Sequence, residues 1–345
     1  GGGIAFESLT NGVISYHLGA GLLLLVVTLY LILGGMRGSA YTDIIQGTLM
    51  LSLMAGFTAF VALKLGGLGP TMKMTASQNP DLISRGSQFG TRLWLSTLFM
   101  IGLNALMYPH TLMRLFSSKS SESLKKMTLL FPTGQFFLLF FSTILGFIGI
   151  SQIPGLTGEA ADNIMPELLN FMAPEAIAAT ALLVILAAVM SSLDSQIFSV
   201  SALISEDFLR DIFGLNDERI TGMSKILTAI IMSVVFVLTM IRPGTIYFLV
   251  EFAFQGYALL FYPVAVGFYW RRSTEKGVFA GLIAGFTGLW LFQLGVLPSS
   301  WTLGFMPLIP LMVIQILVTH LVSRYTGKPP ERRIKSYFDV FEGLW

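Results

Sequence analysis

The stretch Thr180–Asp207, TALLVILAAVMSSLDSQIFSVSALISED, begins as an apolar run and continues with hydroxyls, an amide and carboxylates. Its first half has the composition of a helix in the middle of a bilayer. Its second half adds Ser191, Ser192, Asp194 and Ser195. Ionisable groups inside a membrane span are costly and tend to mark ion or substrate paths. The stretch therefore predicts a membrane helix whose polar face binds something.

The composition of the whole chain supports a membrane protein. The 345 residues are 54% hydrophobic and 12% charged, and the mean hydropathy is +0.75. Soluble domains carry about 25% charged residues. A net charge of +2 gives no basic field for nucleic acid, and zero Cys with three scattered His argue against zinc-type sites. No Ser–His pair shares a helix face near a carboxylate, so we expect neither an enzyme nor an organic cofactor.

Uncharged windows along the chain predict an all-α protein with nine membrane spans. A bilayer core needs about 20 apolar residues per helix. The uncharged run from Gly277 to Ser323 is too long for one span, and LPSSW (Leu297–Trp301) divides it. The predicted spans are 15–33, 42–63, 93–113, 127–151, 175–205, 222–241, 247–269, 277–296 and 302–323.

The basic residues between these spans predict the orientation. Sixteen of the 21 Lys and Arg fall on one side, and five fall on the other: Lys64, Lys73, Arg85, Arg92 and Arg242. Basic loops stay in the cytoplasm. We therefore expect a multi-pass plasma-membrane protein, in the inner membrane if bacterial, with a cytoplasmic C-terminus. The polar loop 66–91 and the acidic connector 155–171 then lie outside.

Residues of the fifth predicted span divide into an apolar face and an oxygen-bearing face. Ser191 and Ser195 are four apart, and Ser192 and Ser195 are three apart, so their hydroxyls converge on a helix. One interpretation is simple packing, because small residues let membrane helices approach closely and Ser bonds to its own helix. Asp194 favours the other interpretation, an ion or substrate site.

Asp43 is a second carboxylate near a membrane span, in GGMRGSAYTDIIQG (Gly34–Gly47). We expect it at a depth similar to that of Ser191–Ser195. A carboxylate near a helix N-terminus is also favoured by the helix dipole alone, and this alternative stays open. Hydroxyl and carboxylate oxygens suit a hard cation, and Na⁺ fits better than a divalent ion because few negative charges are present.

Four segments taken together resemble the sodium/solute symporter family over nearly the whole chain. They are LGGMRGSAYTDIIQG (33–47), YPHTLMRLFSSKSSESLKK (108–126), AAVMSSLDSQIFSVSALISEDFLRDIF (187–213) and VGFYWRRSTEKGVFAGLIAG (266–285). The resemblance implies a LeuT-type bundle, in which two inverted five-helix repeats surround a site near the midplane. It also implies transport by alternating access.

The resemblance further implies a division of the chain. Residues 1–12 resemble the end of a truncated span, and core helices 1 and 2 with most of 3 are expected to be missing. Residues 13–66 match core helices 4 and 5, 67–92 an extracellular loop, and 93–270 the second repeat of core helices 6 to 10. Residues 271–326 match two peripheral helices, and 327–345 a cytoplasmic tail.

Site residues are implied by the same resemblance. The family's shared sodium site matches Ala188, Ser191 and Ser192. A deeper second sodium in some members matches Ser191, Asp194, Ser195 and Asp43. The substrate or gate candidates are Asn104, Tyr108, Leu103, Glu251, Gln255 and Tyr257. In addition, Pro109 is expected to bend its helix, because proline removes a backbone donor.

The function predicted on these grounds is sodium-coupled symport of a small polar organic solute, with a carboxylate or an amino acid favoured. Na⁺ is the coupling ion, and the expected partners are the solute, Na⁺ and membrane lipid. The sequence does not fix the oligomeric state or the number of sodium ions. A transporter-like sensory or signalling module is the alternative, although the chain after Arg324 has no room for a kinase.

Overall fold

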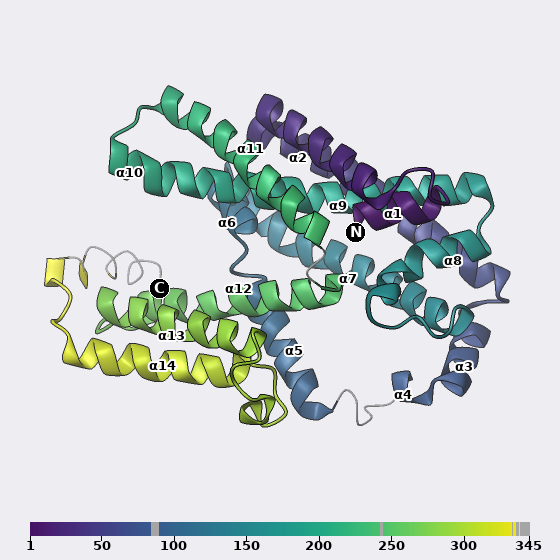
Figure 1. Ribbon diagram of the computed structural model, residues 1–345. Coiled ribbons are helices and arrows are strands. Elements are labelled where there is room, and N and C mark those ends of the chain that lie inside the picture. The colour runs from purple at the N-terminus through teal and green to yellow at the C-terminus, as the bar shows by residue number, and fades with distance from the viewer. Residues whose placement is uncertain (84–89, 242–243, 333, 336–337, 339–345) are drawn as a thin grey trace. The chain divides into compact units, whose positions relative to one another are not determined.

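The structure, a computed structural model, describes residues 1–83, 90–241, 244–332, 334–335 and 338. Three arginines of the charge pattern, Arg85, Arg242 and Arg333, lie outside the described residues. Every regular element in the described part is a helix, as the sequence predicts (Figure 1). The chain divides into two compact units, each assembled from two segments.

The first unit contains residues Gly1–Ser84 and Met113–Ile246. Its helices are α1 (Gly2–Leu9), α2 (Tyr16–Lys64), α3 (Leu68–Gln78), α4 (Pro80–Ile83), α7 (Ser121–Gln152), α8 (Ile164–Met172), α9 (Glu175–Leu203), α10 (Arg210–Phe213) and α11 (Asp217–Ile241). A π-helical turn, Ile204–Leu209, joins α9 to α10.

The second unit contains residues Arg85–Leu112 and Tyr247–Trp345. Its helices are α5 (Thr91–Asn104), α12 (Ile246–Tyr269), α13 (Glu275–Gln293) and α14 (Leu308–Tyr325). A further helix, α6 (Pro109–Phe116), contains the boundary between the units.

Among the described residues, six helices are long and apolar enough to cross a membrane: α2, α7, α9 with its continuation to Phe213, α11, α12 and α14. The first two predicted spans both lie in α2, the third falls on α5 and α6, and the eighth lies in α13. The number nine stays a prediction. The predicted outer loop 66–91 contains α3 and α4, and Thr71 and Thr75 of α3 are buried; its place outside the membrane stays a prediction.

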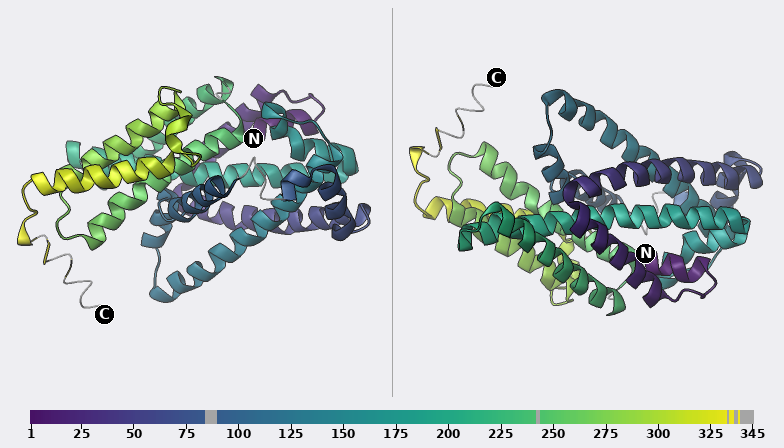
Figure 2. Two further views of the ribbon diagram at one scale, coloured as in Figure 1. Left: turned by 90° about the horizontal axis from the view of Figure 1, so that it is seen from below. Right: turned by 90° about the horizontal axis from the view of Figure 1, so that it is seen from above.

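Helix α2 bends at Gly35. Its 49 residues would extend about 73 Å if straight, more than twice a bilayer core. Gly35 has φ 54° and ψ −149°, a conformation that is costly for residues with a side chain. The right-hand view of Figure 2 shows the change of direction, from the purple part of α2 to the dark blue part. We call residues 16–34 the first segment of α2 and residues 36–64 its second segment.

The two segments of α2 pack into different apolar clusters. In the first segment, Leu23, Leu24, Val27 and Leu31 pack with Ile197 of α9 and Met232 of α11. In the second segment, Phe57 and Val61 pack with Leu145 and Ile148 of α7, with Leu168 and Leu169 of α8, and with Ala181 of α9. Helix α9 therefore contributes to both clusters, and α1 packs against both through Leu9 and Phe6.

Helices of the second unit pack around α14. Helices α13 and α14 lie side by side (Figure 1), and glycines of α13 face α14. A Cβ on Gly277 would lie 2.0 Å from Ser323 Oγ, and a Cβ on Gly281 would lie 2.0 Å from Thr319 Oγ1. Only glycine permits so close an approach of two membrane helices.

The predicted bend at Pro109 is confirmed as an interruption of the helix. Helix α5 ends at Asn104 and α6 begins at Pro109. Proline is tolerated in the first turn of a helix, where its missing N–H would have no partner within the helix. The interruption leaves Tyr108 at the start of α6, where its carbonyl accepts from Thr111 and Leu112.

Candidate functional site

Hydroxyls of α9 meet Asp43 of the second segment of α2. Ser191 Oγ donates to Asp43 Oδ1 at 2.5 Å, and Ser195 Oγ lies 3.4 Å from Asp43 Oδ2. The Asp43 side chain is only 12% exposed. Asp43 and the serines are thus in contact, and their common depth in the membrane stays a prediction. Packing against α9, rather than a helix terminus alone, determines the surroundings of this carboxylate.

Arg114 of α6 also reaches this carboxylate. Its Nη2 forms an ion pair with Asp43 Oδ2 and donates to Ser195 Oγ at 2.8 Å. Sequence reasoning counted Arg114 only as a cytoplasmic basic residue, so its place in the site was missed. The available signal was its position five residues after Pro109 in a segment that carries the family resemblance.

Asp194 lies beside the first carboxylate and is fully buried. Its Oδ2 accepts from Tyr30 OH at 2.8 Å and from Thr42 Oγ1 at 3.3 Å, and its Oδ1 accepts from Ser195 Oγ at 3.1 Å. Sequence reasoning missed Tyr30 and Thr42. Thr42 adjoins Asp43 in the quoted segment, whereas Tyr30 had no signal beyond a hydroxyl in an apolar run.

Ser195 links the two carboxylates, which we call the carboxylate pair. Its single hydroxyl proton has three acceptors within reach: Ser191 O at 2.9 Å, Asp194 Oδ1 and Asp43 Oδ2. One proton serves one acceptor well at a time. With both carboxylates ionised and Arg114 as the one cation paired with them in the described part of the chain, the cluster has one net negative charge. A monovalent cation would balance that charge in a site lined by oxygen.

A divalent metal centre fits less well. Within the described ranges no group of three or more His, Cys, Asp or Glu could hold a metal ion. The oxygens that converge here come from two carboxylates and several hydroxyls. This donor set has the hardness that Na⁺ requires and too little charge for Ca²⁺.

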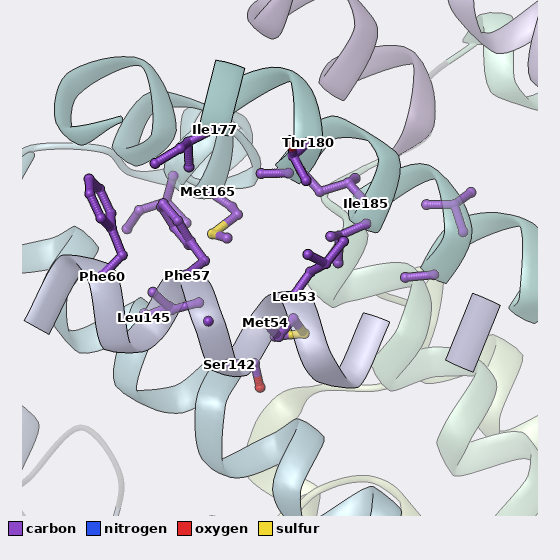
Figure 3. A pocket seen from close by; sticks show the side chains of 17 residues that line it. Leu53, Met54, Phe57, Phe60, Ser142, Leu145, Met165, Ile177, Thr180 and Ile185 are labelled. Carbon is purple, nitrogen blue, oxygen red and sulfur yellow. The ribbon is translucent and has the colours of Figure 1, made fainter. Parts of the chain in front are cut away.

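Ala188 and Ser192 do not join this cluster. Ser192 is exposed, and Ala188 lines a separate pocket of about 470 Å³ in the first unit. Figure 3 shows this pocket, with Phe57, Leu53 and Met165 among its lining side chains. The residues matched to the family's shared sodium site therefore face in two directions. Only Ser191 of the three contacts Asp43.

The pocket beside Ala188 is apolar. Its hydroxyls belong to Ser142 and Thr180, and both donate to carbonyls of their own helices, Leu139 O at 3.1 Å and Ala176 O at 2.8 Å. The rest of its lining consists of aliphatic, aromatic, methionine and glycine residues. It offers no polar partner to a charged solute.

Three of the substrate candidates gather at the helix interruption in the second unit. The rings of Tyr108 and Tyr257 meet edge to face with centroids 5.2 Å apart. Asn104 is 1% exposed, and neither its amide oxygen nor its amide nitrogen has a hydrogen-bond partner among the residues that the structure describes. A buried amide without partners costs free energy, about 1–3 kcal/mol for each group. Such a group is suited to a ligand that supplies the missing bonds.

The other candidates lie elsewhere in the second unit. Glu251 and Gln255 line a pocket of about 560 Å³ with Phe248, Phe252 and Phe305 among its other residues. Gln255 Nε2 donates to Glu251 Oε1 at 3.2 Å, and Gln255 Oε1 accepts from Leu308 N at 3.0 Å. Gln255 thus caps the start of α14.

Leu103 packs against the apolar cluster of α12, α13 and α14. The six candidates therefore divide into the group at the interruption, the pair Glu251 and Gln255, and a packing residue.

Comparison with protein families gives a match over residues 1–285 to the model of the sodium:solute symporter family. The chain belongs to the sodium:solute symporter family. This confirms the resemblance carried by the four segments, and it agrees with the six candidate spans of a multi-pass membrane protein.

Individual symporters of this family match most of the chain. The sodium/proline symporter of Staphylococcus aureus is 27% identical over 343 residues, covering 95% of this chain and 66% of the relative. The high-affinity proline transporter PutP of Bacillus subtilis is 27% identical, covering 82% and 60%. The sodium/pantothenate symporter of Haemophilus influenzae is 27% identical, covering 97% and 68%. The chain spans about two thirds of the length of these relatives.

Proposed function

We propose that the protein is a sodium-coupled symporter that takes up a small organic solute by alternating access. Membership in the sodium:solute symporter family supports the coupling ion and the reaction class. We further propose the LeuT-type bundle with nine spans in this chain, a plasma-membrane location and a cytoplasmic C-terminus. The matched family is described as one of sodium:solute symporters, and this favours a transporter over an enzyme or a sensory module.

The observation that carries the proposal is the net charge of the carboxylate pair. Asp43, Ser191 and Ser195 present converging oxygens, and Asp194 adds a second negative charge through Ser195. One Na⁺ neutralises the cluster while Arg114 stays in place. We propose Asp43, Ser191 and Ser195 as the sodium ligands, with Asp194 supplying the second negative charge behind Ser195. Ala188 and Ser192 are proposed as part of a second ion position on α9.

The solute is proposed to carry a carboxylate. Relatives of this chain are named for proline and for pantothenate, and both compounds contain that group. Asn104 and Tyr108, with Tyr257 beside them, are the proposed solute contacts, because Asn104 has two unpaired polar atoms beside an interrupted helix. Glu251 and Gln255 are the weaker proposal, since Gln255 is already paired on both sides.

Sodium would supply the driving force by binding one conformation better than another. A ligand shifts a conformational equilibrium only by its differential affinity for the two states. Each charge that crosses the membrane contributes about 2.3 kcal/mol per 100 mV. The binding of Na⁺ at the carboxylate pair from outside, and its loss inside, would therefore drive the solute in the same direction.

Uptake of labelled proline and pantothenate by the full protein in vesicles tests this function. The expected result is uptake of a carboxylate-bearing solute with an inward Na⁺ gradient, and little uptake when K⁺ replaces Na⁺. Asp43→Asn should raise the sodium concentration for half-maximal uptake at least tenfold. Asp207→Asn, on the exposed π-helical turn, is the matched control. Equal uptake in Na⁺ and K⁺ would refute sodium coupling.

A further inference from the structure

Asp194 joins the two segments of α2 across the bend at Gly35. Tyr30 belongs to the first segment, and its hydroxyl donates to Asp194 Oδ2 at 2.8 Å. Thr42 belongs to the second segment, and its hydroxyl lies 3.3 Å from the same atom, with Ser39 O at 2.8 Å and Gly38 O at 3.1 Å as the other acceptors of its single proton. Gly35 lies between the two donors in the sequence. We call this arrangement the Asp194 bridge. It fixes one point on each side of the bend to one point on α9.

Within the described residues, no apolar cluster contains side chains from both segments of α2. The first segment packs with α9 and α11, whereas the second packs with α7, α8 and α9. The angle between the segments therefore depends on contacts that reach both of them. A Cβ on Gly35 would meet no atom within 4 Å, so the bend itself is not held by packing around that residue.

A carboxylate suits this position better than a neutral amide. Asp194 accepts three hydrogen bonds, from Tyr30, Thr42 and Ser195, and an ionised carboxylate has about four acceptor positions. An asparagine would present an NH₂ group to at least one of these donors. The cost of burying the charge is offset only when every donor is present, because a half-satisfied buried network destabilises a protein.

The bridge is coupled to the proposed sodium site through Ser195 and Thr42. Thr42 and Asp43 are consecutive residues of α2, so any shift of the helix backbone at this point moves both. Ser195 Oγ can donate to Asp194 or to Asp43, or to the Ser191 carbonyl. A sodium ion bound to the Ser195 oxygen would turn its proton away from the ion, and thus away from Asp43. The proton is then shared between Asp194 and the Ser191 carbonyl only, and its greater share on Asp194 strengthens the bridge.

On the basis of the proposed function, we propose that Asp194, Tyr30 and Thr42 are positioning residues rather than sodium ligands. They set the bend of α2 at Gly35 and make that bend respond to sodium at Asp43. Sodium binding closes the bridge and narrows the range of angles between the two segments. Loss of sodium loosens the bridge and frees the second segment, which contains Asp43.

Distance measurements between two spin labels test the proposal. The 345 residues contain no cysteine, so Leu25→Cys and Leu49→Cys add the only two thiols within them, on exposed positions of the two segments. In the full protein in nanodiscs, Na⁺ should shift or narrow the distance distribution relative to K⁺. Thr42→Val and Tyr30→Phe should each remove this response.

Matched variants separate the bridge from general damage. Thr42→Ser keeps a hydroxyl and should keep the response. Thr28→Val removes a hydroxyl of the same helix that donates only to Leu24 O, and Tyr41→Phe removes an exposed phenol; both should respond as the parent does. In Thr42→Val, binding of radioactive ²²Na⁺ should persist with about fivefold weaker affinity, the effect of one lost hydrogen bond.

The outcomes distinguish the two proposals. A parental sodium response in both Thr42→Val and Tyr30→Phe would overturn the bridge while the sodium site stands. Complete loss of ²²Na⁺ binding in either variant would make that residue part of the ion site itself and would also overturn the positioning role. Absence of ²²Na⁺ binding in the parent protein would overturn the proposed function along with this inference.

Discussion

Ser191 Oγ donates to Asp43 Oδ1 across 2.5 Å, which joins the middle of α9 to the second segment of α2. The two residues are far apart in the sequence and lie in different predicted spans. Their contact gives the proposed sodium site one hydroxyl and one carboxylate at a fixed separation. A site of this kind depends on both partners, because sodium would otherwise have to order them itself.

Ser191→Ala should therefore weaken sodium binding. A hydrogen bond to a charged group contributes about 1.5–3 kcal/mol, so the sodium concentration for half-maximal uptake should rise by roughly tenfold or more. Ser233→Ala, which removes a hydroxyl that donates only to Ala229 O within α11, is the control. An unchanged sodium requirement in Ser191→Ala would remove this serine from the site.

Asn104→Leu should separate solute binding from stability. The substitution removes two buried polar atoms that have no partner, so the free energy of unfolding should stay the same or rise. The KM for the solute should rise about tenfold, while the sodium requirement measured at saturating solute stays close to the parental value. The measurements are thermal unfolding in detergent and uptake kinetics. A destabilised variant with parental KM would show that Asn104 serves the fold.

Gly281→Ala should destabilise the packing of α13 on α14. The added Cβ would lie 2.0 Å from Thr319 Oγ1 and 3.1 Å from Gln315 O, and overpacking of this kind costs about 1–3 kcal/mol. Gly267→Ala, with nothing within 4 Å of its Cβ, is the control and should have little effect. Thr319→Ala added to Gly281→Ala should restore part of the loss. Equal melting temperatures for the two glycine variants would contradict the close approach.

Gly35→Ala should reduce stability although there is room for the methyl group. The backbone at Gly35 has φ 54°, and leaving that conformation would change the bend of α2. We expect a loss of about 1 kcal/mol and slower uptake. Gly34→Ala is the control. Gly34 lies in regular helix with open space around it, so alanine there should leave the stability unchanged or raise it. Thermal unfolding and initial uptake rates measure both variants.

The helical class and much of the candidate site follow from the sequence, for physical reasons. Apolar windows separated by charged connections predicted helices that begin and end close to those observed, such as 247–269 for α12. The four-residue spacing of Ser191 and Ser195 predicted one polar face, and the structure brings that face to Asp43. Periodicity works here because one helix turn fixes which side chains share a face.

Contacts between distant helices could not be read from the same patterns. Arg114 looked like one of many basic residues near a membrane surface, and nothing local indicated its ion pair with Asp43. Tyr30 reaches Asp194 from a span that reads as plain hydrophobic sequence. The predicted spans 15–33 and 42–63 placed an interruption within residues 34–41, but nothing assigned it to Gly35, because glycine occurs in straight membrane helices as well as in bent ones. Tertiary packing, rather than local propensity, decides these features.

The bend at Gly35 also limits how the neighbouring spans can move. Gly35 is the only residue of α2 with non-helical dihedral angles, so a single residue, rather than a flexible loop, connects the two segments. The segments can rotate about this single pivot, but they cannot slide apart without unwinding a turn of helix. Any tilt of one membrane span is therefore passed mechanically to the next as a rotation about a fixed point.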